Sequence, residues 1–311
     1  MPFFVGDSTQ DSATLYFTTF ILLKYSAART LSVYRQWRET LGWSSALAET
    51  LRFSVEDVAH AKDQVERAFR SLRNDDLVVR RGGHLYPKRL QDVQDGPEFL
   101  FVRGDVRLLD EPIVSVVGTR HPSSEGRGGA KDLALRLTER HVVVASGLAY
   151  GIDEAAHEGA LSAGRTVAVI GTPLNKTYPR EHRVLQQLIS ETGVVVSQFL
   201  PGLPVQRWNF PIRNATMSGL SIATVVVEAG ETSGALIQAR ESLKQGRCVF
   251  VPQKAVENPS LQWPKNYVHH KGAKAFRDVD HLMQQLESED LIKSMSDVRP
   301  RSVLTYVTGM Q

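Results

Sequence analysis

Two patterns of apolar and polar positions divide the chain. Over 12–82, apolar residues recur at three- and four-residue spacing, which predicts a set of amphipathic helices. Ser54, followed by Glu56 and Asp57, is typical of a helix start, because a serine cap and early acidic residues suit the amino end of a helix. From residue 113 on, short β-branched runs alternate with helical stretches. We therefore expect a helical part followed by an α/β part.

Six short apolar runs in the second part predict β-strands. Each run is nearly continuous in apolar residues, which is typical of strands buried on both faces of a parallel sheet. The predicted strands are IVSVV (113–117), VVVAS (142–146), TVAVI (166–170), VVVSQ (194–198), TVVVE (224–228) and CVFVP (248–252). Because helical stretches separate them, the fold class is α/β, with a doubly wound, mainly parallel sheet preceded by a small helical domain.

These patterns give three segments. We expect a helical domain over 1–84, an α/β core over 85–280 and a C-terminal tail over 281–311. The stretch 83–112 is rich in Gly, Pro and Asp, so it is expected to connect the first two segments, with one short strand in FLFVRG. The tail is too short for a winged-helix domain.

Composition and charge narrow the class of protein without choosing its partner. A chain of 311 residues with 42% hydrophobic residues is ordinary for globular proteins. The net charge of +3 means that a nucleic-acid partner would bind a folded local patch. Cys248 is the only cysteine, and no Cys/His cluster has metal spacing, so we expect no disulfide, metal or cofactor. We see no signal sequence or membrane-spanning run, and expect a cytoplasmic protein.

Candidate chemistry lies in the residues that follow each strand, because doubly wound sheets bind ligands outside the carboxyl ends of their strands. Gly118, Thr119 and Arg120 follow the first strand. Arg120 stands where a dinucleotide loop has its second glycine, and no lysine completes a triphosphate loop. A guanidinium and the helix start just beyond it both favour phosphate. The alternative is a tight turn with a surface arginine.

Other strand ends carry similar groups. Lys176, Tyr178 and Arg180 follow the third strand, and two cations beside an aromatic ring suit a nucleic-acid backbone with a stacked base. Arg213 and Asn214 begin a helix after the long loop behind the fourth strand. We interpret Phe210, in that loop, as an aromatic side chain that fixes the loop to the core.

The ends of the fifth and second strands offer a helix start and an acid–histidine pair. Ser233 and Gly234 open the helix after the fifth strand, where they form either an anion site or an ordinary cap. Asp153 and His157 lie four residues apart on one helix, a spacing that suits an acid–base or metal pair. Because no third ligand has metal spacing, we interpret them as a capping aspartate and a hydrogen-bonded histidine.

Taken together, the strand ends predict one anion-binding surface. We call it the strand-end rim, and we expect it to bind a polyanion, with no catalytic residue and with Tyr178 as the base-stacking ring. Its residues are Gly118, Thr119, Arg120, Lys176, Arg180, Arg213, Asn214, Ser233 and Gly234.

Several long motifs follow one another over about 85–252: YPKRLQDVQDGPEFLFVRGD, VSVVGTR, SGLAYGIDEAAHEGAL, VAVIGTPLNKTYPREHRVL, FPIRNATMSGLS and VVVEAGETSGALIQARESLKQGRCVFVP. With these motifs the sequence resembles the DNA-processing protein A (DprA/Smf) family. The resemblance implies an extended Rossmann-like core, binding of single-stranded DNA without sequence preference, a homodimer, and delivery of the strand to the RecA recombinase during natural transformation, without catalysis. Carried onto this sequence, it implies DNA binding by most of the strand-end rim, whereas Arg180, Ser233 and Gly234 come from the physical argument alone.

The sequence also departs from the family pattern. Pro173 and Asn175 replace the usual Gly and Asp of one turn, and Ala215 stands where another arginine is usual. The loss of a cation leaves open a diverged role in defence or as a plasmid accessory protein. Two further alternatives use the same fold: a nucleotide-binding sensor, and an enzyme that resembles the phosphoribohydrolases, in which Glu228 would be the residue to test.

Overall fold

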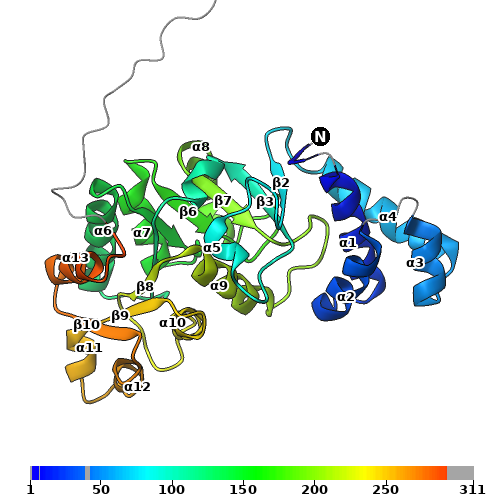
Figure 1. Ribbon diagram of the computed structural model, residues 1–311. Coiled ribbons are helices and arrows are strands. Elements are labelled where there is room, and N and C mark those ends of the chain that lie inside the picture. Colours follow the sequence, from blue (N-terminus) through cyan, green and yellow to red (C-terminus); the bar gives the residue numbers. More distant parts are fainter. Residues whose placement is uncertain (1, 7, 39–42, 293–311) are drawn as a thin grey trace, which may run out of the picture.

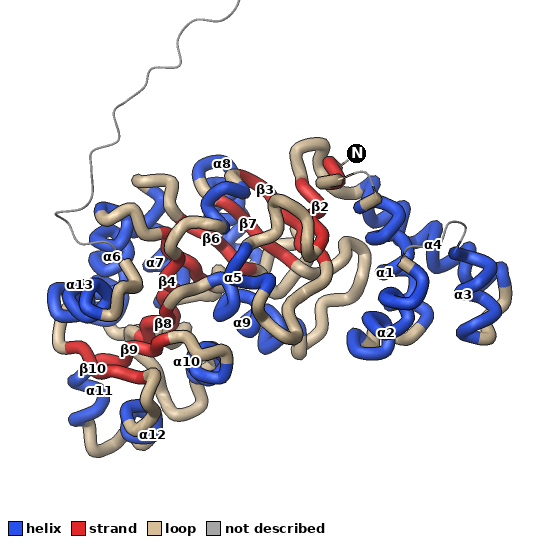
Figure 2. The backbone as a smooth tube through the Cα atoms, in the orientation of Figure 1, coloured by secondary structure: helices blue, strands red, loops and turns tan. Residues whose placement is uncertain are grey.

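The strands of the protein form one sheet. The computed structural model describes residues 2–6, 8–38 and 43–292, and the ten strands found there run in the order β1-β2-β3-β7-β6-β5-β4-β8-β9-β10 (Figures 1 and 2). Their bounds are β1 Phe3–Phe4, β2 Leu77–Arg80, β3 Phe99–Gly104, β4 Ile113–Val117, β5 Val143–Ser146, β6 Thr166–Val169, β7 Val194–Ser197, β8 Ala223–Val226, β9 Cys248–Pro252 and β10 Ala273–Phe276. All neighbours are parallel except the pairs β2–β3 and β3–β7.

The helices of the described residues surround this sheet. They are α1 Thr9–Leu22, α2 Ala27–Trp37, α3 Trp43–Leu51, α4 Val55–Arg70, α5 Lys88–Gln91, α6 Ser124–Glu139, α7 Ile152–Leu161, α8 Arg183–Thr192, α9 Asn209–Leu220, α10 Ala235–Lys244, α11 Gln253–Glu257, α12 Trp263–Val268 and α13 Val279–Ser288, with 3₁₀ turns at Val106–Leu109 and Arg180–His182. Figure 1 places α1–α4 at one end of the molecule and α11–α12 at the other.

The expected fold class is confirmed. The six predicted strands are β4 to β9, with ends that differ by no more than two residues. The strand expected in FLFVRG is β3, which pairs antiparallel with β7. One local prediction was wrong: the expected helical stretch 12–82 ends in a strand, β2. Its short sequence, LVVR, becomes a strand because β3 pairs with it.

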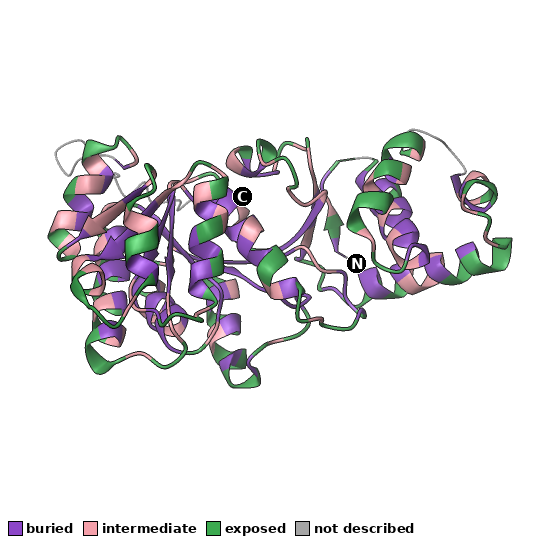
Figure 3. Cartoon of the chain, turned by 90° about the horizontal axis from the view of Figure 1, so that it is seen from below, coloured by how far each residue is buried: buried purple, intermediate pink, exposed green. Residues whose placement is uncertain are grey.

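Helices cover both faces of the sheet and leave a buried core on each side. On one face, α5, α9, α10 and α12 pack against alternate strand residues. On the other face, α6, α7 and α13 cover β4, β5, β8, β9 and β10, whereas α8 and the N-terminal helices cover β2, β3, β6 and β7. Figure 3 shows the buried residues between these layers. Burial of the strands on both faces explains their nearly unbroken apolar sequences.

Aromatic contacts join the N-terminal helices to the sheet. The ring of Phe17 in α1 lies 5.7 Å from that of Phe99 and 5.5 Å from that of Phe101, both in β3.

The predicted helix start at Ser54 is confirmed: its hydroxyl accepts from the Asp57 amide at 3.0 Å, and the Asp57 carboxylate accepts from the Ser54 amide at 3.2 Å. This capping box begins α4.

The expected division of the chain stays a prediction. Strands β1 and β2 lie within 1–84 but belong to the common sheet. Within the expected tail over 281–311, residues 293–311 lie outside the described part. None of the described helices is both long enough and apolar enough to cross a membrane.

Candidate nucleic-acid interface

A pocket of about 470 Å³ opens at the carboxyl ends of β4 and β8. The chain passes from β4 through β5 and β6 to β7 in one direction, and then returns to place β8, β9 and β10 on the other side of β4. Adjacent strands whose connections leave in opposite directions create a crevice at their carboxyl ends. The pocket is lined by parts of the segments 117–121, 149–153, 210–217 and 230–238.

The loop after β4 presents one unpaired cation to this pocket. Arg120 is exposed, and its guanidinium makes no hydrogen bond or ion pair with the described residues. Thr119 is tied down on both sides, because its amide donates to the Glu228 carbonyl at 2.7 Å and its carbonyl accepts from the Ile152 amide at 3.2 Å. A rigid turn therefore carries a free guanidinium at the mouth of the pocket.

Gly118 serves close packing inside the protein as well as lining the pocket. A Cβ atom at this position would lie 2.5 Å from Ile152 Cγ1 and 2.7 Å from the Glu228 carbonyl oxygen. No side chain fits there, because both atoms belong to packed elements. The glycine that follows β4 thus lets α7 and the end of β8 approach the turn.

The amino end of α6 is occupied by a carboxylate of the protein itself. Ser123, the N-cap residue, accepts from the Gly126 amide at 3.0 Å. Its own amide and hydroxyl donate to Glu228, at 3.0 and 2.6 Å. The expectation that this helix start favours a ligand phosphate is therefore wrong: Glu228 takes the place that an anion would fill. Glu228 does not line the pocket.

Arg213 lies in the wall of the pocket and is almost fully buried. Its guanidinium donates to the Val169 carbonyl and, at 3.0 Å, to Asn214 Oδ1. Burial lowers the pKa of Arg213 to about 10, while the nearby Asp153 carboxylate acts in the opposite direction. Arg213 stays charged at neutral pH. Its guanidinium is hydrogen-bonded inside the protein, whereas its sequence position suggested a freely exposed cation.

His157 is hydrogen-bonded as expected, but the expected capping role of Asp153 is wrong, because the N-cap of α7 is Gly151, without a side-chain cap, and Asp153 binds amides of the loop before the helix. The Asp153 carboxylate accepts from the Gly147 amide at 3.1 Å and from the Ala149 amide at 3.4 Å. His157 is fully buried, and its Nδ1 lies 2.7 Å from the Thr166 hydroxyl. Burial lowers the pKa of His157 to about 3, which keeps the ring neutral. Among the described residues, no group of three or more His, Cys, Asp or Glu side chains is placed to hold a metal.

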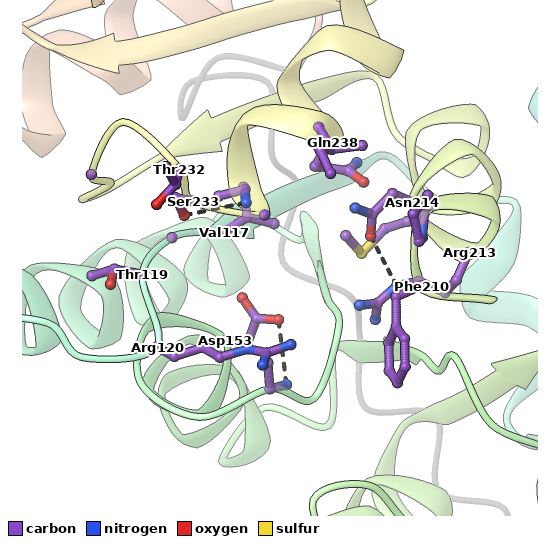
Figure 4. Close-up of a pocket in the computed structure, with 18 of the residues that line it drawn as sticks. Val117, Thr119, Arg120, Asp153, Phe210, Arg213, Asn214, Thr232, Ser233 and Gln238 are labelled. Carbon is purple, nitrogen blue, oxygen red and sulfur yellow. Dashed lines mark hydrogen bonds between the residues drawn. The ribbon is translucent and has the colours of Figure 1, made fainter. Parts of the chain in front are cut away.

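The amino end of α10 faces the pocket from the other side. Ser233 Oγ accepts from the Ala235 amide at 3.3 Å, and Gly234, the N-cap residue, follows it in the lining. The capping and the anion-site interpretations remain compatible, because a cap uses only some of the amides at a helix start. Figure 4 shows Ser233, Arg120 and Arg213 around the same space.

Seven residues of the strand-end rim thus line one pocket, and the other two lie outside it. Lys176 and Arg180 are exposed in the loop after β6, where Lys176 Nζ lies 3.4 Å from the Leu203 carbonyl oxygen. Tyr178 connects the two regions: its exposed ring lies 5.4 Å from the ring of Phe210, which lines the pocket. Phe210 packs against Gly171, as expected of a residue that fixes the loop.

Two further residues of the lining were missed by the sequence argument. His121 directly follows Arg120 and is exposed at the same turn. Gln238 lies one turn after Gly234 on α10, so it shares the helix face that points to the pocket. Adjacency and helical spacing were the signals that could have found them.

Comparison with known proteins decides the family. A model of the family described as DNA recombination-mediator protein A matches residues 78–287. The chain belongs to this family. The matched residues extend beyond 85–252, the range in which the sequence motifs resemble the family. They include most of β2 and α13.

Individual members of the DNA recombination-mediator protein A family agree with this assignment. DNA processing protein DprA of Bacillus subtilis is 30% identical over 274 residues, which cover 87% of this chain and 91% of that protein. The X-ray structure of DprA from Streptococcus pneumoniae matches with a TM-score of 0.68 and 27% identity, over 89% of this chain and 95% of that one. A DprA structure from Helicobacter pylori, described for its single-stranded DNA binding mode, matches with a TM-score of 0.59 and 26% identity, over 66% and 94%.

Proposed function

We propose that this protein processes DNA by binding single-stranded DNA along the strand-end rim. The observation that carries the proposal is the unpaired guanidinium of Arg120 at the mouth of the pocket between β4 and β8. Membership of the DNA recombination-mediator family supports it, as does the Helicobacter pylori relative described as binding single-stranded DNA. A backbone phosphate at Arg120 would also lie near the amino end of α10.

The rim offers separate contacts to a flexible strand. Lys176 and Arg180 provide exposed cations in the segment after β6 that also carries Tyr178. Successive phosphates of the DNA strand can therefore contact cations at successive strand ends of the sheet. The exposed ring of Tyr178, supported by Phe210, offers a face for an unpaired base. Arg213 contributes its charge from below the surface and holds Asn214 in place. Such contacts read phosphate and ring faces, so the binding has no sequence preference.

The wider role is part of the proposal, and the resemblance to the DNA-processing protein A family suggests it. The protein acts without catalysis in the cytoplasm, as a homodimer that protects incoming DNA and loads the RecA recombinase onto it during natural transformation. The carboxylate of Glu228 supports the non-catalytic assignment, because it caps α6 and does not line the pocket.

Equilibrium binding to one labelled oligonucleotide, single-stranded or annealed to its complement, tests the proposal at low salt. We expect tighter binding to the single strand, because its phosphates can follow the rim and its bases are free to stack. Equal or tighter binding to the duplex would reject the proposal. A thermal shift with a mononucleotide but none with the oligonucleotide would favour a nucleotide sensor, and release of free base from nucleoside monophosphates would favour a hydrolase.

A further inference from the structure

A second hollow, of about 410 Å³, lies between the end of α4 and the α/β core. The segment after α4 contributes Ser71 and Arg73, and β3 contributes Arg103. The loop after β6 and helix α8 supply most of the remaining wall. This seam hollow, as we call it, shares no lining residue with the pocket between β4 and β8.

The walls of the seam hollow are held by contacts across the seam. The Arg103 guanidinium pairs with the buried Asp76 carboxylate, with Nη2 and Oδ2 2.7 Å apart, and it also donates to the Leu174 carbonyl at 3.2 Å. Asn175 Nδ2 donates to Ser71 Oγ at 3.3 Å, which joins the β6–α8 loop to the end of α4. The hollow is therefore formed before any ligand arrives.

The charge of the seam hollow favours an anion. Arg73 and Arg183 are exposed, and neither guanidinium has a hydrogen-bond or ion-pair partner among the described residues. No aspartate or glutamate lines the hollow. Of the neighbouring acidic groups, Asp76 pairs with Arg103, and Glu191 accepts from Gln187, a residue of the wall, at 2.9 Å. Two free guanidinium groups in a lining without a carboxylate suit a phosphate.

The same wall also contains a buried hydrogen-bond acceptor without a donor. Gln186 is 6% exposed, and its Oε1 has no hydrogen-bond partner, whereas Nε2 lies 3.4 Å from the Leu174 carbonyl oxygen. A buried acceptor without a donor is unfavourable and uncommon. The fully ionised phosphate group of a phosphate ester has no hydrogen to donate, so such a ligand needs its donor elsewhere. A ligand that carries a phosphate together with an N–H or O–H group would satisfy both Gln186 and the arginines.

We propose that the seam hollow binds a mononucleotide. Its phosphates contact Arg73 and Arg183, and its base or sugar donates to Gln186 Oε1. The volume lies within the range of about 300–1,000 Å³ that is usual for small-ligand pockets. Because Arg73 follows α4 and Arg183 begins α8, the bound nucleotide joins the N-terminal helices to the core. This site is separate from the strand-end rim, and the inference does not rest on DNA binding there.

Thermal unfolding and equilibrium dialysis of the full chain with ATP, CTP and inorganic tripolyphosphate test the site. We expect both nucleotides to raise Tm in a concentration-dependent way. Arg73→Ala and Arg183→Ala abolish the shift, and Asn175→Asp, which places a carboxylate of the same shape in the hollow, weakens nucleotide binding at least about tenfold. Gln186→Leu weakens nucleotide binding but spares tripolyphosphate. Arg120→Ala, which changes only the other pocket, leaves nucleotide binding intact.

Several results would overturn this assignment. One is the absence of nucleotide binding by the wild-type protein, whose folding is verified by its own unfolding transition. Another is nucleotide binding that survives Arg183→Ala and disappears in Arg120→Ala, because the ligand would then occupy the pocket between β4 and β8. A third is weaker oligonucleotide binding in Arg183→Ala without any nucleotide binding, which would assign the hollow to the DNA strand. Loss of DNA binding in Arg120→Ala alone tests only the strand-end rim.

Discussion

Glu228 and Ser123, which lie 105 positions apart in the sequence, are joined at the amino end of α6 by hydrogen bonds of 3.0 and 2.6 Å from the serine amide and hydroxyl. The carboxylate thereby fills a position that a ligand anion would otherwise take. The binding that we propose for this region therefore depends on Arg120 and on the amino end of α10, whereas the amino end of α6 is occupied within the protein.

Removal of the Glu228 carboxylate tests this structural role. Glu228→Ala should lower the free energy of unfolding by about 1 kcal/mol, because the amide and hydroxyl of the cap residue Ser123 and the dipole of α6 lose their partner. Urea unfolding followed by circular dichroism measures the change. Glu49→Ala is the control, since Glu49 is exposed in α3 and its carboxylate has no hydrogen-bond or ion-pair partner among the described residues. Equal stability of Glu228→Ala and wild type would contradict the capping role.

Arg213 should matter more for stability than Arg120 does. Arg213→Ala leaves the buried Asp153 carboxylate without its nearby positive charge and the Val169 carbonyl without a donor. Loss of a buried donor to a buried acceptor costs about 2 kcal/mol. Arg120→Ala should unfold at the wild-type urea concentration, because that side chain is exposed and unpaired. Similar midpoints for Arg213→Ala and Arg120→Ala would show that the burial of Arg213 has been misjudged.

Two glycines should respond in opposite directions to alanine. A Cβ atom at Gly147 would lie 2.6 Å from Arg213 Cζ, so Gly147→Ala should destabilise the protein by about 2 kcal/mol through overpacking. Gly128 lies in α6 with no atom within 4 Å of such a Cβ, so Gly128→Ala should stabilise it by up to about 1 kcal/mol. Urea midpoints measured side by side give the comparison. A harmless Gly147→Ala would contradict the packing of Arg213.

His157 should make stability depend on pH. Its pKa in the folded protein is about 3, below the ordinary 6.5, because the ring is buried. Between these values the unfolded chain binds a proton that the folded protein does not, so stability falls as the pH drops below about 6.5, by at most about 1.4 kcal/mol per pH unit. Urea unfolding from about pH 7 to about pH 5 should give a shallower pH dependence for His157→Gln than for wild type. If the free energy of unfolding had the same pH dependence in His157→Gln and wild type, His157 would not be the cause of that dependence.

The sequence predicted the parts of the fold that depend on local pattern. The strands β4 to β9 carry unbroken apolar runs, and Ser54 has its capping partner three residues away. It could not predict β2 as a strand, because that strand exists through its pairing with β3. The burial of Arg213 depends likewise on the Val169 carbonyl, 44 positions away. Contacts at such distances follow from the packed fold, and no local pattern reports them.

The same distinction separates the predicted site residues. Placement after a strand correctly brought Gly118, Arg120, Asn214 and Ser233 to one pocket, because parallel strands share a carboxyl edge. The position of a residue after a strand could not show which of these groups are already hydrogen-bonded within the protein. Only three-dimensional contacts reveal that the Thr119 amide is already bound.

The salt dependence of single-stranded DNA binding by Arg120→Ala tests the central claim most directly. Wild-type affinity should fall linearly with salt on logarithmic axes, and Arg120→Ala should bind every sequence more weakly, with a slope smaller by about 0.7. Arg107→Ala should match wild type, because Arg107 precedes β4, away from the carboxyl edge of the strands, and pairs with Asp105. An Arg120→Ala protein with the affinity and salt slope of wild type would contradict the account.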